Sequence, residues 1–211
     1  MYNDNIYAGF FGTDESHDFS FFRKPIRNTE PLQCITIPDI YRYIVNSRYA
    51  GSQTATLRSI TDKETARRYK AENFDFCTFS GTFRTRNKEG LILHSELLCI
   101  DFDHVADIPS LKERLLNNEY FETELLFRSP SGDGLKWVID IDRRGWEHSR
   151  FYNAVYTYLV ESGYPEPDKS GSDVARSCFI PYDPEVYINT KHTNYVKEKN
   201  FFAGEVGECP F

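Results

Sequence analysis

The 211-residue sequence lacks the features that would place a protein in or across a membrane. No apolar run approaches the roughly 18 residues needed to cross a bilayer. The residues after Met1 provide neither the basic region nor the apolar region of a signal peptide. We therefore expect a cytoplasmic protein with no membrane partner.

Cysteine is sparse and has no metal-binding pattern. The five thiols include no Cys-x-x-Cys pair and have no histidine at a ligand spacing, which argues against zinc. We expect reduced and mostly buried side chains. The cysteines are Cys34, Cys77, Cys99, Cys178 and Cys209.

An excess of positive charge is also missing. The formal net charge is −7, which excludes a simple basic coat for nucleic acid but leaves room for a local basic groove.

Gly/Ser-rich linkers and internal repeats are absent, so residues 19–211 are predicted to form a single domain, preceded by a loosely held segment, 1–18. The hydrophobic content of 40%, with 17 Phe and 14 Tyr, is typical of a globular chain.

Periodicity and turn residues predict a mixture of helices and strands without βαβ alternation, which indicates an α+β fold. Thr61 and Glu64 match a capping box at the start of a helix that continues through Lys70. Pro38 and Pro109 are suited to two further helix starts. The expected strands are 19–26, 74–83, 91–102, 125–128, 135–141, 178–180 and 186–188, and the expected helices lie near 38–44, 61–70, 110–118 and 146–161.

The clearest chemical signal is a pair of acids at the end of an apolar strand, in Leu97-Leu-Cys-Ile-Asp101-Phe-Asp103. Alternation along the strand puts Asp101 and Asp103 on one face, with Cα atoms ~6.6 Å apart. At an effective dielectric near 20 the two charges repel by about 2.5 kcal/mol, which a bound divalent cation would reverse. A solvated strand end is the alternative interpretation.

A second signal is the glycine-bearing segment Ser129-Pro-Ser131-Gly132-Asp-Gly134-Leu-Lys136 between two predicted strands. Glycines allow a ligand to approach the backbone, and exposed N–H groups can bind phosphate oxygens. Ser131 can donate to a phosphate, and Lys136 supplies a mobile charge. An ordinary hairpin turn uses the same residue types.

A third signal lies further along the chain. Asp168 and Asp173 occupy a Pro/Gly-containing loop, followed by Arg176. Either acid could complete a metal site, and the arginine could reach a triphosphate. A surface loop with Asp as a turn former is the alternative. Together, the three signals are what metal-dependent phosphoryl transfer requires: carboxylates for metal, a phosphate cradle, and cations for developing charge.

These motifs resemble those of the archaeo-eukaryotic primases and primase-polymerases. "LLCIDFD" looks like their Asp-x-Asp strand, "SPSGDGLK" like their Ser-x-His hairpin, and "PDKSGSDVAR" like the element with the later Asp. The nearer likeness, over about residues 19–190, is to the primase-like domain at the N-terminus of virulence-associated E proteins of Bacteroidetes and mobile elements. The resemblance implies a mixed or antiparallel sheet with an RRM-like catalytic half and flanking helices.

The resemblance also implies roles for single residues. Asp101, Asp103 and Asp168 would hold Mg²⁺ or Mn²⁺, with Asp173 as the competing third acid. Contacts to the nucleotide would come from the glycine segment and the late arginine: Ser129, Ser131, Gly132, Gly134, Lys136 and Arg176. The family has histidine where this chain has Lys136, and lysine replaces neither its protonation nor its stacking.

A basic stripe precedes the acidic strand. Arg84, Arg86 and Lys88 would share one face if that segment were extended, and would then contact a nucleic-acid backbone. A solvated turn is the alternative. His94, on the same predicted strand as the acids, fits a core position as well as a site position.

The leading hypothesis is therefore a nucleotidyltransferase of the DNA primase-polymerase type, acting in replication of mobile elements. Its partners would be a nucleoside triphosphate and single-stranded DNA or a primer–template. The chain contains no P-loop, so an accompanying helicase module would be encoded elsewhere. The alternatives are a catalytically inactive module that binds nucleotide or single-stranded nucleic acid, an Asp-x-Asp nucleotide-sugar transferase, and a metal-dependent nuclease.

Overall fold

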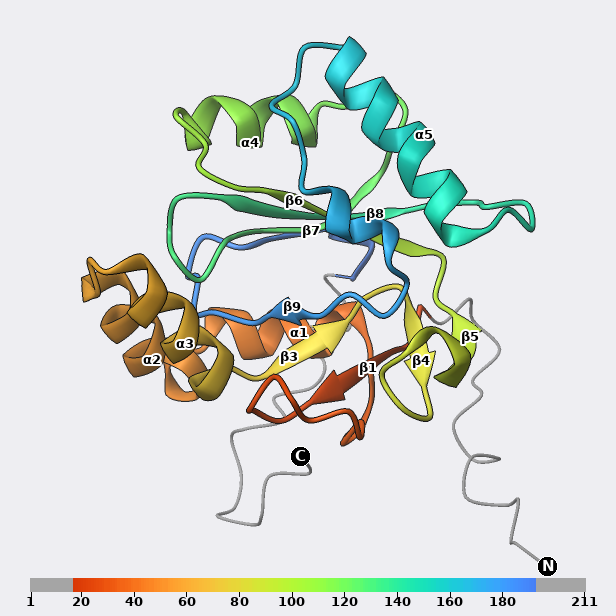
Figure 1. The fold of residues 1–211 in the computed structure, drawn as a ribbon. Coiled ribbons are helices and arrows are strands. Elements are labelled where there is room, and N and C mark those ends of the chain that lie inside the picture. The colour runs from red at the N-terminus through yellow and green to blue at the C-terminus, as the bar shows by residue number, and fades with distance from the viewer. Residues whose placement is uncertain (1–16, 193–211) are drawn as a thin grey trace, which may run out of the picture.

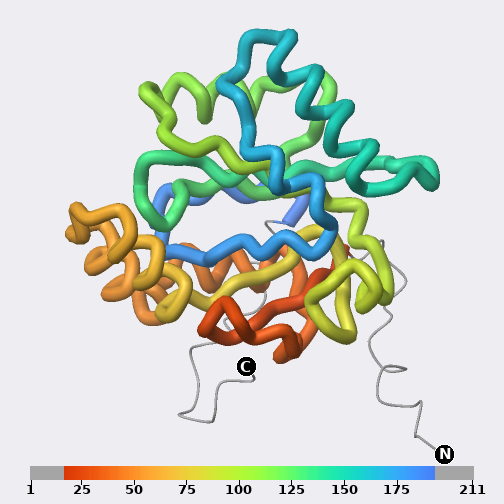
Figure 2. The backbone as a smooth tube through the Cα atoms, viewed as in Figure 1, coloured from red at the N-terminus to blue at the C-terminus, as the bar shows by residue number. Residues whose placement is uncertain are grey.

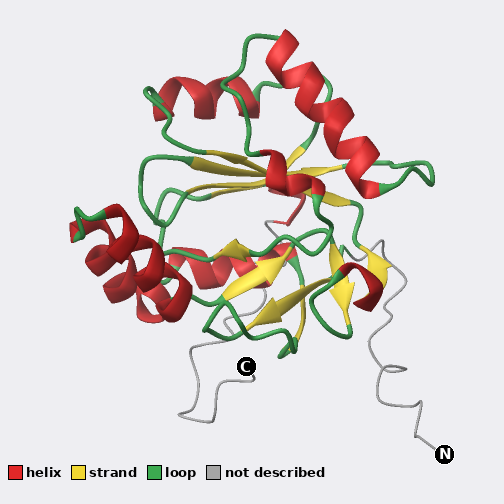
Figure 3. Ribbon diagram, in the orientation of Figure 1, coloured by secondary structure: helices red, strands yellow, loops and turns green. Residues whose placement is uncertain are grey.

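The computed structural model describes residues 17–192, which form an α+β fold with antiparallel sheets and five α-helices (Figure 1). The layers are two helices, a four-stranded sheet, and a second four-stranded sheet with its own helices, as the colouring in Figure 3 makes plain. This class agrees with the α+β prediction. No helix in the described range is both long enough and apolar enough to cross a membrane.

The sheet that carries the acids, the site sheet, has the strand order β10-β7-β8-β6. Its strands are β6 (Leu97–Phe102), β7 (Thr123–Arg128), β8 (Leu135–Asp140) and β10 (Tyr187–Ile188). The opposite sheet has the order β2-β1-β3-β9, with β1 (Phe19–Phe22), β2 (Gln33–Ile35), β3 (Phe76–Thr78) and β9 (Cys178–Phe179). A hairpin of β4 (Gly81–Phe83) and β5 (Leu91–His94) completes the strands.

Two helices begin close to the proline signals expected from the sequence. α1 (Ile37–Val45) starts at a capping box formed by Thr36 and Asp39, and α4 (Ile108–Leu116) starts at Asp107. α3 (Lys63–Asn73) is capped by Asp62, whose carboxylate accepts from the Thr65 N–H, so the predicted Thr61–Glu64 box was wrong by one residue. The remaining helices are α2 (Ser47–Ser59) and α5 (His148–Glu161).

Two hydrophobic cores flank the site sheet. One lies between the sheets and α1 and contains Phe21, Ile40 and Val138. The other lies between the outer face of the site sheet and helices α4 and α5, and contains Ile100, Leu115, Trp137, Tyr152 and Leu159. Because both faces are covered, β6 can present polar side chains only at its end. Figure 2 shows the late part of the chain passing from one sheet to the other, consistent with β9 and β10 belonging to different sheets.

Several predicted elements were too long. The expected strand 91–102 breaks at Ser95 and Glu96, where Glu96 adopts a φ of 57°, and strand 74–83 breaks into β3 and β4. The strand predicted over 19–26 ends at Phe22, since Lys24 and Pro25 belong to a loop. The sequence pattern did not predict α2, which is a polar helix with a central glycine. Residues 1–16 of the predicted loose segment, and Cys209, lie outside the described range.

Candidate metal and nucleotide site

The acid pair lies at the end of β6 on the face that looks toward the opposite sheet. Leu98, Ile100 and Phe102 point into the outer core, as the alternation predicted. Leu97 and Cys99 point the other way, toward the core between the sheets. Asp101 continues this inner face, and Asp103 follows directly after the strand. The sequence thus changes from apolar to acidic where the strand leaves the core.

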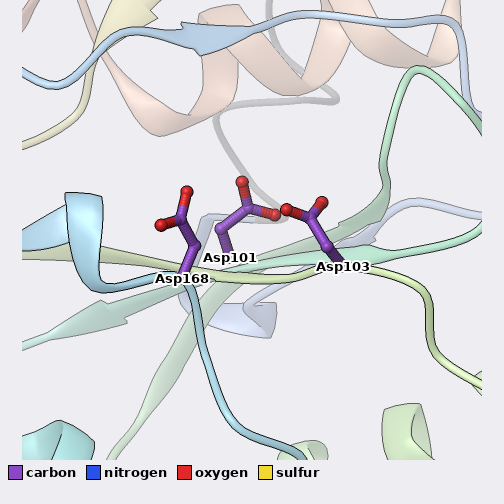
Figure 4. A group of neighbouring side chains, drawn as sticks. All are labelled: Asp101, Asp103 and Asp168. Carbon is purple, nitrogen blue, oxygen red and sulfur yellow. The ribbon is translucent and has the colours of Figure 1, made fainter. Parts of the chain in front are cut away.

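The third acid joins the pair through the backbone. Asp168 N–H donates to the Asp101 carbonyl at 2.8 Å. Asp168 also caps the 3₁₀ helix η2 (Lys169–Ser172). One carboxylate oxygen each from Asp101, Asp103 and Asp168 lie within 4.8 Å of one another (Figure 4). We call these three residues the site triad.

Lys136 lies on β8 directly opposite Asp101 in the strand register, and its ammonium contacts Asp101 Oδ2. Burial lowers the pKa of Lys136, but the Asp101 carboxylate and nearby thiols outweigh it and raise the pKa overall. Burial raises the pKa of Asp101, helped by repulsion from Asp103 and opposed by Lys136. Lys136 was predicted to bind nucleotide phosphate, whereas here it neutralises part of the triad.

Asp168 is already charged and oriented by its neighbours. Its Oδ1 accepts from the Ser170 N–H at 2.9 Å, and its Oδ2 accepts from Arg176 at 3.1 Å. Burial favours the neutral acid, yet the bonds from Ser170 and the charges of Arg176 and Lys136 lower its pKa overall. Half of the Arg176 side chain remains exposed, so the guanidinium can also serve a ligand.

The glycine segment forms a tight turn beside the triad. Gly132 has a φ of 88°, and its N–H donates to the Ser129 carbonyl at 2.9 Å. A side chain at Gly134 would collide with the Phe102 carbonyl, so glycine is needed for the hairpin to lie against the end of β6. Ser131 is exposed, while Ser129 is buried and its hydroxyl has no partner in the described chain. Their phosphate contacts stay predictions.

Two cations near the site were not predicted from the sequence. Lys70 on α3 lies close enough to Asp103 and Asp101 to interact with their charges. Burial and the charge of Lys136 lower the pKa of Lys70, and the two acids oppose that effect. Arg58 on α2 donates to the carbonyls of Pro130 at 3.2 Å and Ser129 at 3.3 Å, which fastens the glycine turn. Both residues come from helices far from the motifs in sequence, so no local pattern could identify them.

A pair of histidines contacts the 3₁₀ helix η2. His94 and His148 are joined at 3.1 Å, and His148 Nε2 lies 2.9 Å from the Gly171 carbonyl. Tyr152 donates to the Asp168 carbonyl at 2.6 Å. Burial, with Arg143 nearby, lowers the pKa of His94 to about 3, so the ring is neutral at pH 7. His94 therefore lies outside the triad but is linked to the segment that carries its third acid.

The remaining predicted residues lie apart from the triad. Asp173 is exposed, accepts from the Ala175 N–H, and is not among the clustered carboxylates of the described chain. The segment 84–90 is a bend followed by a 3₁₀ turn, so the extended geometry assumed for the basic stripe was wrong. Arg86 folds back onto the Ile26 carbonyl, and Lys88 lies 4.0 Å from Glu147. Arg84 is exposed.

The triad suits a divalent cation. Asp101 Oδ1 is buried and has no hydrogen-bond partner within the described chain, which is a costly state that a cation would relieve. Oxygen ligands are those preferred by Mg²⁺ and Mn²⁺. A cavity of about 20 Å³ touches Asp101, Lys136, Ser170 and Arg176, room for an ion or one water.

Comparison with known proteins identifies the family. A model of the BT4734-like, N-terminal domain matches residues 69–188, more than half of the chain. The chain belongs to this family. The match begins in α3 and ends at β10, so it includes the whole triad, Lys70, Lys136 and Arg176. Neither a curated protein nor a solved structure matches the chain.

Proposed function

We propose that this BT4734-like domain is a metal-dependent nucleotidyltransferase of the primase-polymerase type, acting on a nucleoside triphosphate and single-stranded or primed DNA in replication of mobile elements. The observation that carries the proposal is the convergence of Asp101, Asp103 and Asp168, from two distant parts of the chain, within 4.8 Å. The likeness of three sequence motifs to those of primase-polymerases and virulence-associated E proteins adds independent support.

The charges around the triad suit a triphosphate. Two cations, Lys136 and Arg176, contact Asp101 and Asp168, and a third, Lys70, lies close enough to interact with the charges of Asp101 and Asp103. A divalent cation, when bound, would offset charge developing at the transferred phosphate. With the acids engaged in this way, Lys136 and Arg176 would turn from carboxylate toward phosphate oxygens, and Lys70 would contribute charge from the α3 side.

Two sets of hydrogen bonds would hold the site residues in a fixed orientation toward the substrate. The Asp168–Asp101 backbone bond fixes the distance between the late acid and the strand, and Arg58 holds the glycine turn. Positioning of this kind accounts for much of the rate enhancement in phosphoryl transfer. The exposed Ser131 and the main chain of Gly132 would meet the phosphates from the turn.

Primer extension tests the proposal. The full chain, with Mn²⁺ or Mg²⁺, a primer–template and either ribo- or deoxynucleotides, should incorporate nucleotide, and Asp101→Ala/Asp103→Ala should reduce incorporation to background. Asp142→Ala removes an exposed acid whose one partner among residues 17–192 is Arg144, and it is the control variant. Incorporation that survives the double substitution would reject the assignment of the triad.

A second candidate is a nucleotide-binding or single-strand-binding module without catalysis. It is favoured by the contact of Lys136 with Asp101, because a buried ammonium in that position competes with a metal for the central acid. Metal-dependent nucleotide binding, measured by calorimetry, with no incorporation in any combination of template and nucleotide would favour this candidate.

A further inference from the structure

A second pocket opens away from the triad, where α1, α2, the end of α3 and the loop after β1 meet. Its volume is about 330 Å³, at the lower end of the range for small-molecule sites. Ten residues line it: Arg23, Lys24, Tyr43, Arg48, Tyr49, Ala50, Gln53, Asn73, Phe74 and Asp75. We call it the α1–α2 pocket.

The charge of the pocket is opposite to that of the protein. Three cations, Arg23, Lys24 and Arg48, line it together with one acid, Asp75, on a chain with a net charge of −7. Asp75 is buried and its oxygens are occupied by Arg23 at 2.8 Å, the Lys24 N–H at 2.9 Å and the Tyr43 hydroxyl at 2.8 Å. The acid is thus part of the frame and does not repel an anion at the mouth.

Two of the cations are available to a ligand. Lys24 and Arg48 are exposed, and the described chain offers neither side chain an ion-pair partner. Arg48 and Tyr49 belong to the first turn of the 13-residue helix α2, where the helix dipole adds positive potential. An anion in the pocket would therefore meet two side-chain cations and a helix N-terminus together.

The lining of the α1–α2 pocket also contains aromatic rings and side-chain amides. The rings of Tyr43 and Tyr49 stack with centroids 4.7 Å apart at 17°. The amides of Gln53 and Asn73 lie on the same lining and can both donate and accept. A planar ring with polar edges, joined to a phosphate, matches aromatic faces, amides and cations in one pocket of this size.

We infer that the α1–α2 pocket binds the phosphate-bearing unit of a nucleotide, either free or at the 5′ end of a strand. The pocket is separate from the triad but connected to it through two helices. Arg48 lies at one end of α2 and Arg58, which holds the glycine turn, about 15 Å along the same helix. On α3, Asn73 lines the pocket about one turn beyond Lys70, whose charge interacts with Asp101 and Asp103.

Calorimetric titration of the full chain with ADP in EDTA tests this inference, because chelation removes any metal-dependent binding at the triad. Lys24→Glu/Arg48→Glu should weaken ADP binding at least tenfold. The main-chain N–H of Lys24 keeps its bond to Asp75 in this variant. Lys63→Glu/Arg67→Glu, which changes the charge equally at exposed positions of α3 outside the lining, should leave affinity within twofold.

The sources of the phosphate are separated by a second titration with an oligonucleotide carrying a 5′-phosphate or a 5′-hydroxyl. Charge-dependent binding of ADP assigns a free nucleotide, and charge-dependent binding of the 5′-phosphorylated strand alone assigns a strand end. If Lys24→Glu/Arg48→Glu lowers the melting temperature, Lys24→Gln/Arg48→Gln replaces it.

The inference would be overturned if neither probe bound, or if substitutions in the pocket left the affinity unchanged. Asp101→Ala/Asp103→Ala should leave ADP affinity in EDTA unaltered, and loss of binding in that variant would assign the ADP to the triad instead. The inference does not require nucleotidyl transfer. Nucleotide binding in the α1–α2 pocket can therefore be rejected while the nucleotidyltransferase proposal stands, and it can hold if that proposal is rejected.

Discussion

Two carboxylate clusters lie at the site sheet, and they differ in how their charge is compensated. In the site triad, Asp103 is exposed and has no ion-pair or hydrogen-bond partner in the described chain, and Asp101 Oδ1 is buried without one. The other cluster consists of Glu122, Glu124 and Asp140, which we call the edge triad.

The edge triad is neutralised by the chain itself. Lys191 Nζ lies 3.8 Å from Glu122, 2.7 Å from Glu124 and 3.5 Å from Asp140. Its contact with Glu124 is an ion pair without hydrogen-bond geometry. His192 lies 2.6 Å from Glu124. Carboxylates that converge in this way therefore serve to dock a chain segment, whereas those of the site triad keep ligand capacity. Proximity of acids alone does not distinguish the two cases.

The largest expected effect is on metal binding. Mn²⁺ with a nucleoside triphosphate should raise the melting temperature of the full chain, and Asp101→Ala/Asp103→Ala should abolish that shift, since two of three ligands are lost. Glu122→Gln/Asp140→Asn should retain it, because the edge triad already holds Lys191. A shift that is lost in the edge variant and kept in the site variant would reverse our assignment of the two clusters.

Next in size is the stability of the edge triad. Burial raises the pKa of Glu124, but the hydrogen bond with His192 and the ion pair with Lys191 lower it below its ordinary value of 4.5. An acid with a lowered folded-state pKa contributes stability above pH 4.5 that is lost as the pH falls through the folded value. Glu124→Gln should cost about 1–3 kcal/mol at pH 7, measured by urea unfolding, because it leaves Lys191 and His192 without their acid.

The pH dependence supplies the control for that measurement. The difference between wild type and Glu124→Gln should shrink as the pH falls below about 4.5 toward 3. A constant difference over this range would mean that lost packing, rather than lost charge, explains the cost.

A smaller effect is expected where the site triad is partly neutralised. Lys136→Met keeps the length of the side chain and removes the ammonium that contacts Asp101. Mn²⁺ affinity, measured by calorimetry, should rise about three- to tenfold, because the ion no longer displaces a cation. Lys136→Arg, which retains the charge, should show no such gain. Weaker Mn²⁺ binding in the Met variant would indicate that Lys136 organises the carboxylates instead of competing for them.

The smallest effect concerns support of the third acid. Tyr152→Phe removes one hydroxyl, which donates to the Asp168 carbonyl at 2.6 Å. The free energy of unfolding should fall by about 1 kcal/mol, and Mn²⁺ affinity by a few-fold, since Asp168 is less firmly placed. Tyr156→Phe, at a half-buried position of α5 whose hydroxyl contacts Glu166, should leave metal affinity unchanged. Equal losses in both variants would show a general effect of α5 stability.

The comparison also shows what a sequence can predict about such a site. The alternation in Leu97–Asp103 correctly predicted which side chains of β6 enter the core, since strand periodicity is local. The turn residues correctly predicted the hairpin of β7 and β8. The contact of Lys136 with Asp101, by contrast, depends on strand register, and the choice of Asp168 over Asp173 depends on one backbone bond.

Contacts that span layers were beyond local patterns. Lys70 and Arg58 reach the site from helices of the opposite layer, and α2 is too polar to be detected by its periodicity. The shared face considered for the basic stripe was wrong for a related reason: it required an extended segment, and 84–90 is bent. The nucleic-acid contacts of Arg84, Arg86 and Lys88 stay a prediction. The types of residue at the site could thus be predicted from the sequence, but the contacts that each residue makes could not.

The bond between the Asp168 N–H and the Asp101 carbonyl uses only main-chain atoms. Replacing either carboxylate leaves that bond in place, so the loop stays docked on the strand while an acidic group of the site triad is removed. A variant of this domain that has lost a carboxylate of the site triad is therefore expected to keep its fold, so intact folding is a poor guide to whether the site can still bind a ligand.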